Sequence, residues 1–138
     1  MQKVIITYKL ADGVALDEYR KWSLEVDQRI TAYEPSIARC EPHVVDSVDP
    51  AGTVIHIFED IDIDSWDAYQ EMSRTSEPMK IVMEGFNRLV DLDSVVTICG
   101  SRIKSARPSR ARRMRPAGCS SLWRSLWSVP GASALEQR

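Results

Sequence analysis

The sequence predicts an α+β fold in which helical segments connect four strands. Three observations carry this prediction: β-branched runs recur along the chain, apolar residues at spacings of three and four lie between them, and Pro and Gly mark the segment ends. The order over residues 1–103 is β-α-β-β-α-β, which is the ferredoxin-like split βαβ pattern. Its right-handed crossovers place the first and third strands at the centre of the sheet and the second and fourth at its edges.

The first half of the pattern is a strand followed by an amphipathic helix. Residues 3–10, KVIITYKL, are β-rich with few polar positions, as expected of a strand buried on both faces. Residues 11–13, ADG, have the composition of a turn. From Leu16, apolar residues at spacings of three and four predict a helix to about Tyr33, and Pro35 ends it.

A hairpin forms the middle of the pattern. Residues 36–46 and 53–61 are two strand-like runs, and the segment SVDPAG between them contains the Pro and Gly of a hairpin loop. Helices cover only one face of such a sheet, and the strands do not alternate cleanly between apolar and polar residues. The other face must therefore also be buried, and a second copy of the same sheet is the simplest cover. We expect a homodimer with closed two-fold symmetry.

The second helical region and a last strand complete the pattern. Asp62 or Asp64 can cap a short helix, because a side-chain oxygen at this position accepts from the first backbone N–H groups. Ser76 can cap a second helix with Pro78 in its first turn. Residues 94–99, SVVTIC, then form the fourth strand.

The hairpin register predicts that the only two histidines lie side by side. Centring the loop near residues 49–50 pairs Val45 with Val54, Arg39 with Asp60, and His43 with His56. Two imidazoles in contact would not both carry charge, so one would be neutral and able to accept a proton. We therefore name His56 as the candidate proton-transfer residue and His43 as the residue that orients it or shares the proton. The alternative is that both rings are core residues bonded to backbone or water.

A metal site is the second interpretation of the histidines. Glu41 or Asp60 could complete a ligand set with His43 and His56. However, these residues have no standard ligand spacing, and acidic residues on strands more often form ion pairs. We therefore expect no metal.

Four aromatic residues are candidates for substrate binding: Tyr8, Trp22, Trp66 and Phe58. Tyr8 could offer its phenol to a ligand or could be a core residue with its hydroxyl at the rim. Trp22 lies off the main apolar stripe of the first helix and could form a pocket wall or the edge of the core, and Trp66 allows the same two interpretations. Aromatic walls with a few polar groups suit a flat, hydrophobic substrate.

Charge divides the chain into two parts. Residues 104–138 contain eight Lys and Arg and one acidic residue, whereas residues 1–103 contain ten Lys and Arg and nineteen acidic residues. This asymmetry predicts an acidic folded domain over residues 1–103 and a basic tail over residues 104–138 that is largely disordered or forms a short docking helix. The run RPSRARRMR could bind phosphates, but an acidic domain makes nucleic-acid binding an unlikely main activity.

Composition also limits the class of protein. The sequence has no run of 18 apolar residues, so we expect no membrane span, and it starts directly with a strand. The three cysteines lack CxxC spacing, so we expect neither disulfides nor structural zinc, and a reducing cytoplasm is the expected location. No Gly-rich phosphate loop is present, which predicts that no nucleotide cofactor is used.

Three segments of the sequence resemble the REDY-like (HapK) family, a branch of the dimeric α+β barrel superfamily. They are KVIITYKLADGVALDEYRKW, DIDSWDAY and SEPMKIVMEGFNRLVD, and the resemblance covers residues 1–103. It implies a homodimer whose two sheets form a barrel, with a pocket in each subunit between sheet and helices. The superfamily includes cofactor-free monooxygenases and cyclases of aromatic natural products, and REDY-like members occur in bacterial pathways to prodigiosin-type pyrroles and bisindoles.

These observations together predict a small cofactor-independent enzyme of bacterial secondary metabolism. Its expected substrate is a hydrophobic aromatic intermediate of the bisindole or pyrrole type, and its expected chemistry is proton transfer, such as cyclisation. Two alternatives stay open. One is a cofactor-free monooxygenase of the antibiotic-biosynthesis type, and the other is a non-catalytic barrel that binds a small molecule or serves in a stress response.

Overall fold

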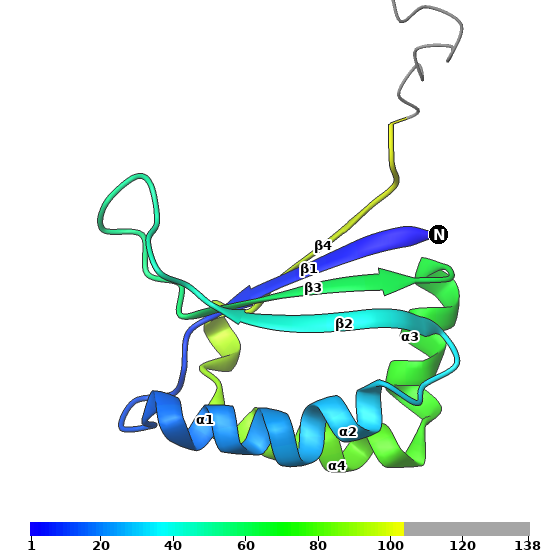
Figure 1. The fold of residues 1–138 in the computed structure, drawn as a ribbon, viewed down its shortest axis with the longest axis horizontal. Helices are drawn as coiled ribbons and strands as arrows, with labels where there is room; N and C mark the ends of the chain where they lie inside the picture. The colour runs from blue at the N-terminus through cyan, green and yellow to red at the C-terminus, as the bar shows by residue number, and fades with distance from the viewer. Residues whose placement is uncertain (104–138) are drawn as a thin grey trace, which may run out of the picture. The chain divides into compact units, whose positions relative to one another are not determined.

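The computed structural model describes residues 1–103. Its four-stranded antiparallel sheet has the order β2-β3-β1-β4 (Figure 1). The strands are β1 (Gln2–Tyr8), β2 (Ile37–Val44), β3 (Ile57–Ile63) and β4 (Val96–Gly100). The predicted α+β class and the central position of the first and third strands are confirmed. The predicted basic tail, with its docking helix, lies outside the described residues.

The first helical region is one continuous segment of three parts. It runs through α1 (Leu16–Trp22), a π-helical turn η1 (Ser23–Asp27) and α2 (Gln28–Thr31). The predicted helix from Leu16 is confirmed, although it ends two residues before Tyr33. A π-helical turn is wider than an α-helical turn and often occurs at functional sites.

The second helical region consists of α3 (Trp66–Thr75) and α4 (Glu77–Leu89), and the short 3-10 helix η2 (Leu92–Ser94) leads into β4. Ser76 caps α4 as predicted, since its Oγ accepts from the backbone N–H of Met79. The predicted Asp62 or Asp64 cap of α3 is wrong. Ser65 caps this helix instead, because β3 continues to Ile63 and leaves both aspartates before the helix start.

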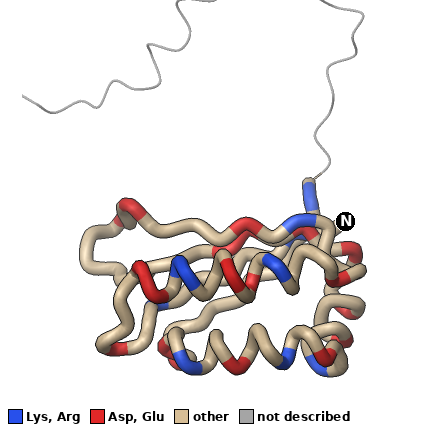
Figure 2. The backbone as a smooth tube through the Cα atoms, turned by 60° about the horizontal axis from the view of Figure 1, so that its bottom comes forward, with Lys and Arg blue, Asp and Glu red and all other residues tan. Residues whose placement is uncertain are grey.

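All of these helices lie on one face of the sheet, and no described helix covers the other face, here called the open face (Figure 1). Acidic and basic residues alternate along the helices (Figure 2). No described helix is long and apolar enough to cross a membrane. The buried core therefore lies between the helices and one side of the sheet.

Strand alternation decides which residues enter this core. On β3, the buried residues are Ile57, Glu59, Ile61 and Ile63, whereas the residues between them lie on the open face. On β1, Val4 and Tyr8 are buried under the helices, and the alternate residue Lys3 is exposed on the open face. In the single chain β1 is therefore buried on one face, not on both as the sequence predicted.

The observed hairpin register differs from the predicted one by two residues. Arg39 pairs with Asp62 and His43 pairs with Phe58, so the predicted pairing of His43 with His56 is wrong. A shift by two keeps every residue on its predicted face. Arg39 forms ion pairs with both its predicted partner Asp60 and its observed partner Asp62. Its Nε lies 2.8 Å from Oδ2 of Asp62, and its Nη2 lies 3.4 Å from Oδ2 of Asp60. Charge pairing therefore does not distinguish the two registers.

Candidate active site

The helices and the sheet enclose a cavity of roughly 250 Å³ with mostly apolar walls. Ile6, Ile61, Val82 and Phe86 are among its apolar lining residues. Seven lining residues carry polar side-chain atoms: Asp27, Thr31, Cys40, Glu59, Tyr69, Ser73 and Thr97. Small-molecule sites typically combine apolar walls with a few polar groups in this way.

Glu59 is the central polar group of the cavity. It lies at an inward position of β3 and is only 8% exposed. Its Oε1 accepts a hydrogen bond of 2.5 Å from the hydroxyl of Tyr8. The Tyr8 oxygen lies 2.6 Å from the hydroxyl of Tyr19, which must donate because the single proton of Tyr8 is already used. A buried chain of hydrogen bonds thus runs from Tyr19 through Tyr8 to Glu59.

The surroundings of Glu59 bring its proton equilibrium close to neutral pH. Burial and the nearby charge of Asp27 raise the pKa of Glu59 to about 7, although the hydrogen bond from Tyr8 acts in the opposite direction. Burial also raises the pKa of Tyr8 and Tyr19 well above the ordinary phenol value, so both remain proton donors. A carboxyl group that gains and loses its proton near pH 7 is suited to general acid–base chemistry.

Asp27 is a second carboxylate in the same cavity. The π-helical turn η1 places it there, and it is 5% exposed. Its Oδ1 accepts a hydrogen bond of 2.9 Å from Thr31, whereas its Oδ2 is buried and has no hydrogen-bond partner among residues 1–103. Burial raises the pKa of Asp27. This carboxylate therefore has an unused acceptor oxygen.

Cys40 also lines the cavity, from the edge strand β2. Burial, followed by the charge of Glu59, raises the pKa of its thiol. The thiol form is a poor nucleophile compared with a thiolate. Glu59 and Asp27 are therefore the candidate reactive groups of the cavity.

Neither histidine lines the cavity. His56 is exposed and its Nδ1 accepts a hydrogen bond of 2.9 Å from the backbone N–H of Leu10. His43 is exposed on the open face, where its ring stacks on Phe58 with 4.6 Å between ring centroids. Its Nδ1 lies 2.9 Å from the carbonyl oxygen of Glu41. The two histidines therefore do not face each other across the hairpin as predicted, because the shifted register sets His43 opposite Phe58.

The four predicted substrate-binding aromatics occupy different environments. Tyr8 is buried and bonded to Glu59, and Trp66 stacks on Tyr69 of the cavity wall with 5.6 Å between centroids. Phe58 lies on the open face, away from the cavity. Their roles in substrate binding stay predictions.

Trp22 is a buried core residue whose position depends on a glycine in the neighbouring helix. Its ring packs beside Tyr19 with 5.7 Å between centroids. A Cβ atom at Gly85 of α4 would lie 2.0 Å from the indole Nε1, so only glycine leaves room for the ring. Trp22 thus packs α1 against α4 behind the hydrogen-bonded tyrosines.

Sequence reasoning missed both carboxylates. For Glu59 a signal was present, because in IFEDIDI it falls in phase with three isoleucines and so lies on the apolar side of the strand. Asp27 follows a spacing of four with Tyr19, Ser23 and Thr31, and all four are buried. A regular α-helix with 3.6 residues per turn would rotate such a series off one face, whereas the π-helical turn keeps it there.

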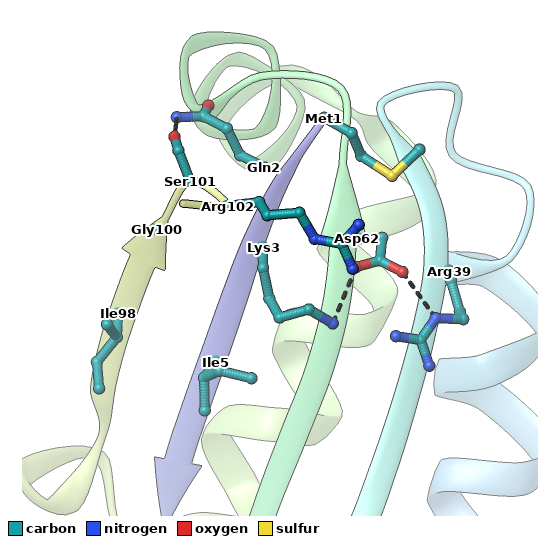
Figure 3. Close-up of a pocket in the computed structure, with 10 residues that line it drawn as sticks. All are labelled: Met1, Gln2, Lys3, Ile5, Arg39, Asp62, Ile98, Gly100, Ser101 and Arg102. Carbon is teal, nitrogen blue, oxygen red and sulfur yellow. Dashed lines mark hydrogen bonds and ion pairs between the residues drawn. The ribbon is translucent and has the colours of Figure 1, made fainter. Parts of the chain in front are cut away.

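A larger hollow of roughly 690 Å³ lies on the open face (Figure 3). Three of its charged groups form ion pairs, since Asp62 lies 3.0 Å from Lys3 and 2.8 Å from Arg39, and Arg102 also lines the hollow. Hydrogen bonds from Arg39 and Lys3 lower the pKa of Asp62, which keeps this carboxylate ionised. The carboxylate of this hollow is already paired with two cations, whereas Glu59 of the smaller cavity has no cationic partner among the described residues, so the smaller cavity is the better candidate site. Among the described residues, no three His, Cys, Asp or Glu side chains are grouped to hold a metal ion.

An antiparallel sheet of order β2-β3-β1-β4 with helices on one face defines the ferredoxin-like α+β class. The sequence matches the family described as REDY-like protein HapK over residues 2–103, and the chain belongs to this family. The resemblance seen in the sequence is thereby confirmed. A comparison with curated proteins found no match.

Solved structures share this fold. HapK from Hahella chejuensis is 23% identical, with a TM-score of 0.63 over 78% of this chain and 97% of that chain. The Arabidopsis thaliana protein At3g17210 is 13% identical, with a TM-score of 0.62 over 78% and 100% of the two chains. A dimeric ferredoxin-like protein of unknown function from Thermobifida fusca is 11% identical, with a TM-score of 0.57 over 73% and 90%.

Proposed function

We propose that this protein is a cofactor-independent enzyme of bacterial secondary metabolism that moves a proton on a small aromatic intermediate, as in a cyclisation. The observation that carries the proposal is Glu59, a carboxyl group with a pKa of about 7 in a mostly apolar cavity. Such a group holds the proton below neutral pH and accepts it above, which general acid–base catalysis requires. Membership of the REDY-like family supports the substrate class.

The size of the cavity supports a small substrate. An apolar cavity of about 150 Å³ takes up benzene, so roughly 250 Å³ suits a molecule of one or two rings. A pyrrole-type intermediate fits this volume better than a bisindole. Ser73, Met83 and Thr97 are both exposed and part of the lining, so the substrate would enter between them.

The hydrogen-bonded tyrosines determine which oxygen of Glu59 is available for proton transfer. Glu59 in its ionised form takes a proton from a carbon or nitrogen of the substrate through its free Oε2. Tyr8 donates to Oε1, which holds the carboxyl group in place and leaves Oε2 to accept the proton. Glu59 then returns the proton to another atom of the same molecule, so the reaction needs no oxidant or reductant.

The Kemp elimination of 5-nitrobenzisoxazole tests this use of Glu59. A base removes the ring C–H proton of this two-ring probe, the N–O bond breaks, and the coloured cyanophenolate forms. We expect the wild-type protein to catalyse the reaction, with a rate that rises with pH about a midpoint near 7. Glu59→Gln should lower the rate about a hundredfold, within the range of general-base effects.

The histidines provide the matched controls. His43→Ala and His56→Ala should leave the elimination rate within twofold of wild type, since both rings lie outside the cavity. A rate lost in these variants and kept in Glu59→Gln would contradict the proposal and restore the histidine mechanism. Probe binding without any elimination would favour the non-catalytic binding barrel.

The proposal includes a homodimer formed through the open face. Val96 and Ile98 of β4 are more than half exposed there, and Phe58 and Ile5 share the same face. The Thermobifida fusca protein of the same fold is described as dimeric. A second copy of the sheet would bury these apolar residues around the central ion pairs.

A further inference from the structure

The unused oxygen of Asp27 indicates what the cavity binds. Only 5% of the surface of Asp27 is exposed, and its Oδ2 has no hydrogen-bond partner among the residues that the structure describes. Buried carboxylate oxygens normally accept hydrogen bonds, because leaving one unpaired in an apolar environment is costly. A bound ligand with an N–H donor would satisfy this oxygen.

The charges around Asp27 favour a cationic donor. The cavity brings Asp27 of η1 and Glu59 of β3 together, and none of its described lining residues is Lys, Arg or His. The other titratable groups that face it are acids as well: Cys40 of β2, Tyr69 of α3 and, behind Glu59, Tyr8 of β1 and Tyr19 of α1. A ligand would therefore have to supply the positive charge that balances the two buried carboxylates.

We propose that the cavity binds an aromatic molecule of one or two rings that carries a cationic nitrogen, and that Asp27 holds this nitrogen. The inference rests on the same site as the proposed function and adds the charge of the substrate. Charge-assisted hydrogen bonds between N–H donors and carboxylates are about twice as strong as neutral ones. An anionic ligand would be repelled, because it would add a third negative charge to a buried site.

The pKa values agree with this geometry. The pKa of Glu59 and of Asp27 is raised chiefly by burial, so each carboxyl group resists ionisation in the empty cavity. A bound cation favours ionisation of both. The same ligand charge that Asp27 holds would then prepare Glu59 as a base.

Three isosteric probes test the proposal: benzamidine, a cation at pH 8, neutral benzamide and anionic benzoate. They share one ring and one planar substituent, so they differ mainly in charge. We expect wild-type protein at pH 8 to bind benzamidine at least tenfold more tightly than benzamide, and not to bind benzoate, as titrated by NMR. Nuclear Overhauser contacts from the probe ring to the methyl groups of Ile61 and Val82 locate the bound probe in the cavity.

Asp27→Asn keeps the shape of the side chain and removes its charge. We expect this variant to bind benzamidine and benzamide within threefold of each other. Glu25→Gln removes an exposed acid from the same π-helical turn and should keep the full preference. The wild-type comparison of the three probes stands on its own if Asp27→Asn does not fold.

Several results would overturn the proposal: equal binding of benzamidine and benzamide to wild type, binding of benzoate, contacts only outside the cavity, or no binding of benzamidine. These results are separate from a failure of the proposed function. If the protein catalyses the Kemp elimination through Glu59 but does not prefer benzamidine, the proposed function holds and the cation site is contradicted. If the protein prefers benzamidine but does not catalyse the elimination, the cation site holds and the proposed function is contradicted.

Discussion

Glu59 occupies an apolar position at an energetic cost that depends on pH. Its pKa is about 7 in the folded protein against an ordinary value of 4.5, so the folded state binds this proton more tightly than the unfolded state. The stability that the protonated group contributes is fully present below pH 4.5. It is lost as the pH rises through about 7, since ionisation of the buried group then opposes folding.

Glu59→Gln should remove this pH dependence, because the amide stays neutral and can still accept from Tyr8. Wild type and variant should have similar free energies of unfolding near pH 4.5, and the variant should be more stable by about 3 kcal/mol at pH 8.5. Urea denaturation at several pH values measures the difference. Glu25→Gln, at an exposed acid, should show no such trend, and a constant difference for Glu59→Gln would contradict the assigned environment.

Single residues were the least predictable part of the molecule from its sequence. His43 and His56 were predicted to be buried as rare imidazoles in apolar runs. His43 is exposed because it lies on the open face of β2, and His56 is exposed in the loop between β2 and β3, whose path no periodicity encodes. The buried position of Glu59 was predictable, because the two-residue repeat of a strand places it on the same face as Ile57 and Ile61. Composition pointed to the histidines, whereas strand alternation points to Glu59, the base of the proposed function.

Elements were predicted well in kind and less well in detail. The hairpin register was wrong by two residues because cross-strand matches are weak, about 0.2–1 kcal/mol each, and Arg39 can satisfy both registers. The pairing of β3 with β1 adds a constraint that the hairpin sequence alone does not contain. The predicted sheet face of each residue was still correct, because a register shift of two residues does not change the face on which a side chain lies.

The helix from Leu16 shows a different limit. Its apolar spacing fits a regular α-helix, and the π-helical turn η1 changes which polar residues lie on the buried side. Asp27 and Thr31 enter the core through this wider turn, and no apolar pattern marks them. The sequence pattern therefore does not mark the proposed ligand-binding residue.

The whole domain was predictable because order and chirality restrict the topology so strongly. A β-α-β-β-α-β order with right-handed crossovers leaves the observed arrangement β2-β3-β1-β4 as the expected one. The division into an acidic domain over residues 1–103 and a basic tail rests on charge alone and stays a prediction. Assembly is the remaining question at this level, because one face of the sheet is uncovered.

Ile98→Asp should convert the proposed homodimer into a monomer. Ile98 is 56% exposed on the open face, and a charge there would be buried against the second sheet. Ile81→Asp is the matched control, since Ile81 is 57% exposed but lies on α4, on the side of the sheet away from the open face. Sedimentation velocity distinguishes the two. A wild-type monomer, or a dimer that persists in Ile98→Asp, would contradict assembly through the open face.

The ionisation of Glu59 can be observed directly. Protein labelled with ¹³C at the glutamate carboxyl groups gives one NMR resonance per glutamate, and the Glu59 resonance is the one missing from Glu59→Gln. We expect this resonance to titrate with a midpoint near pH 7. A midpoint near 4.5, the ordinary value for glutamate, would mean that the carboxyl group is solvated and cannot serve as the base of this cavity.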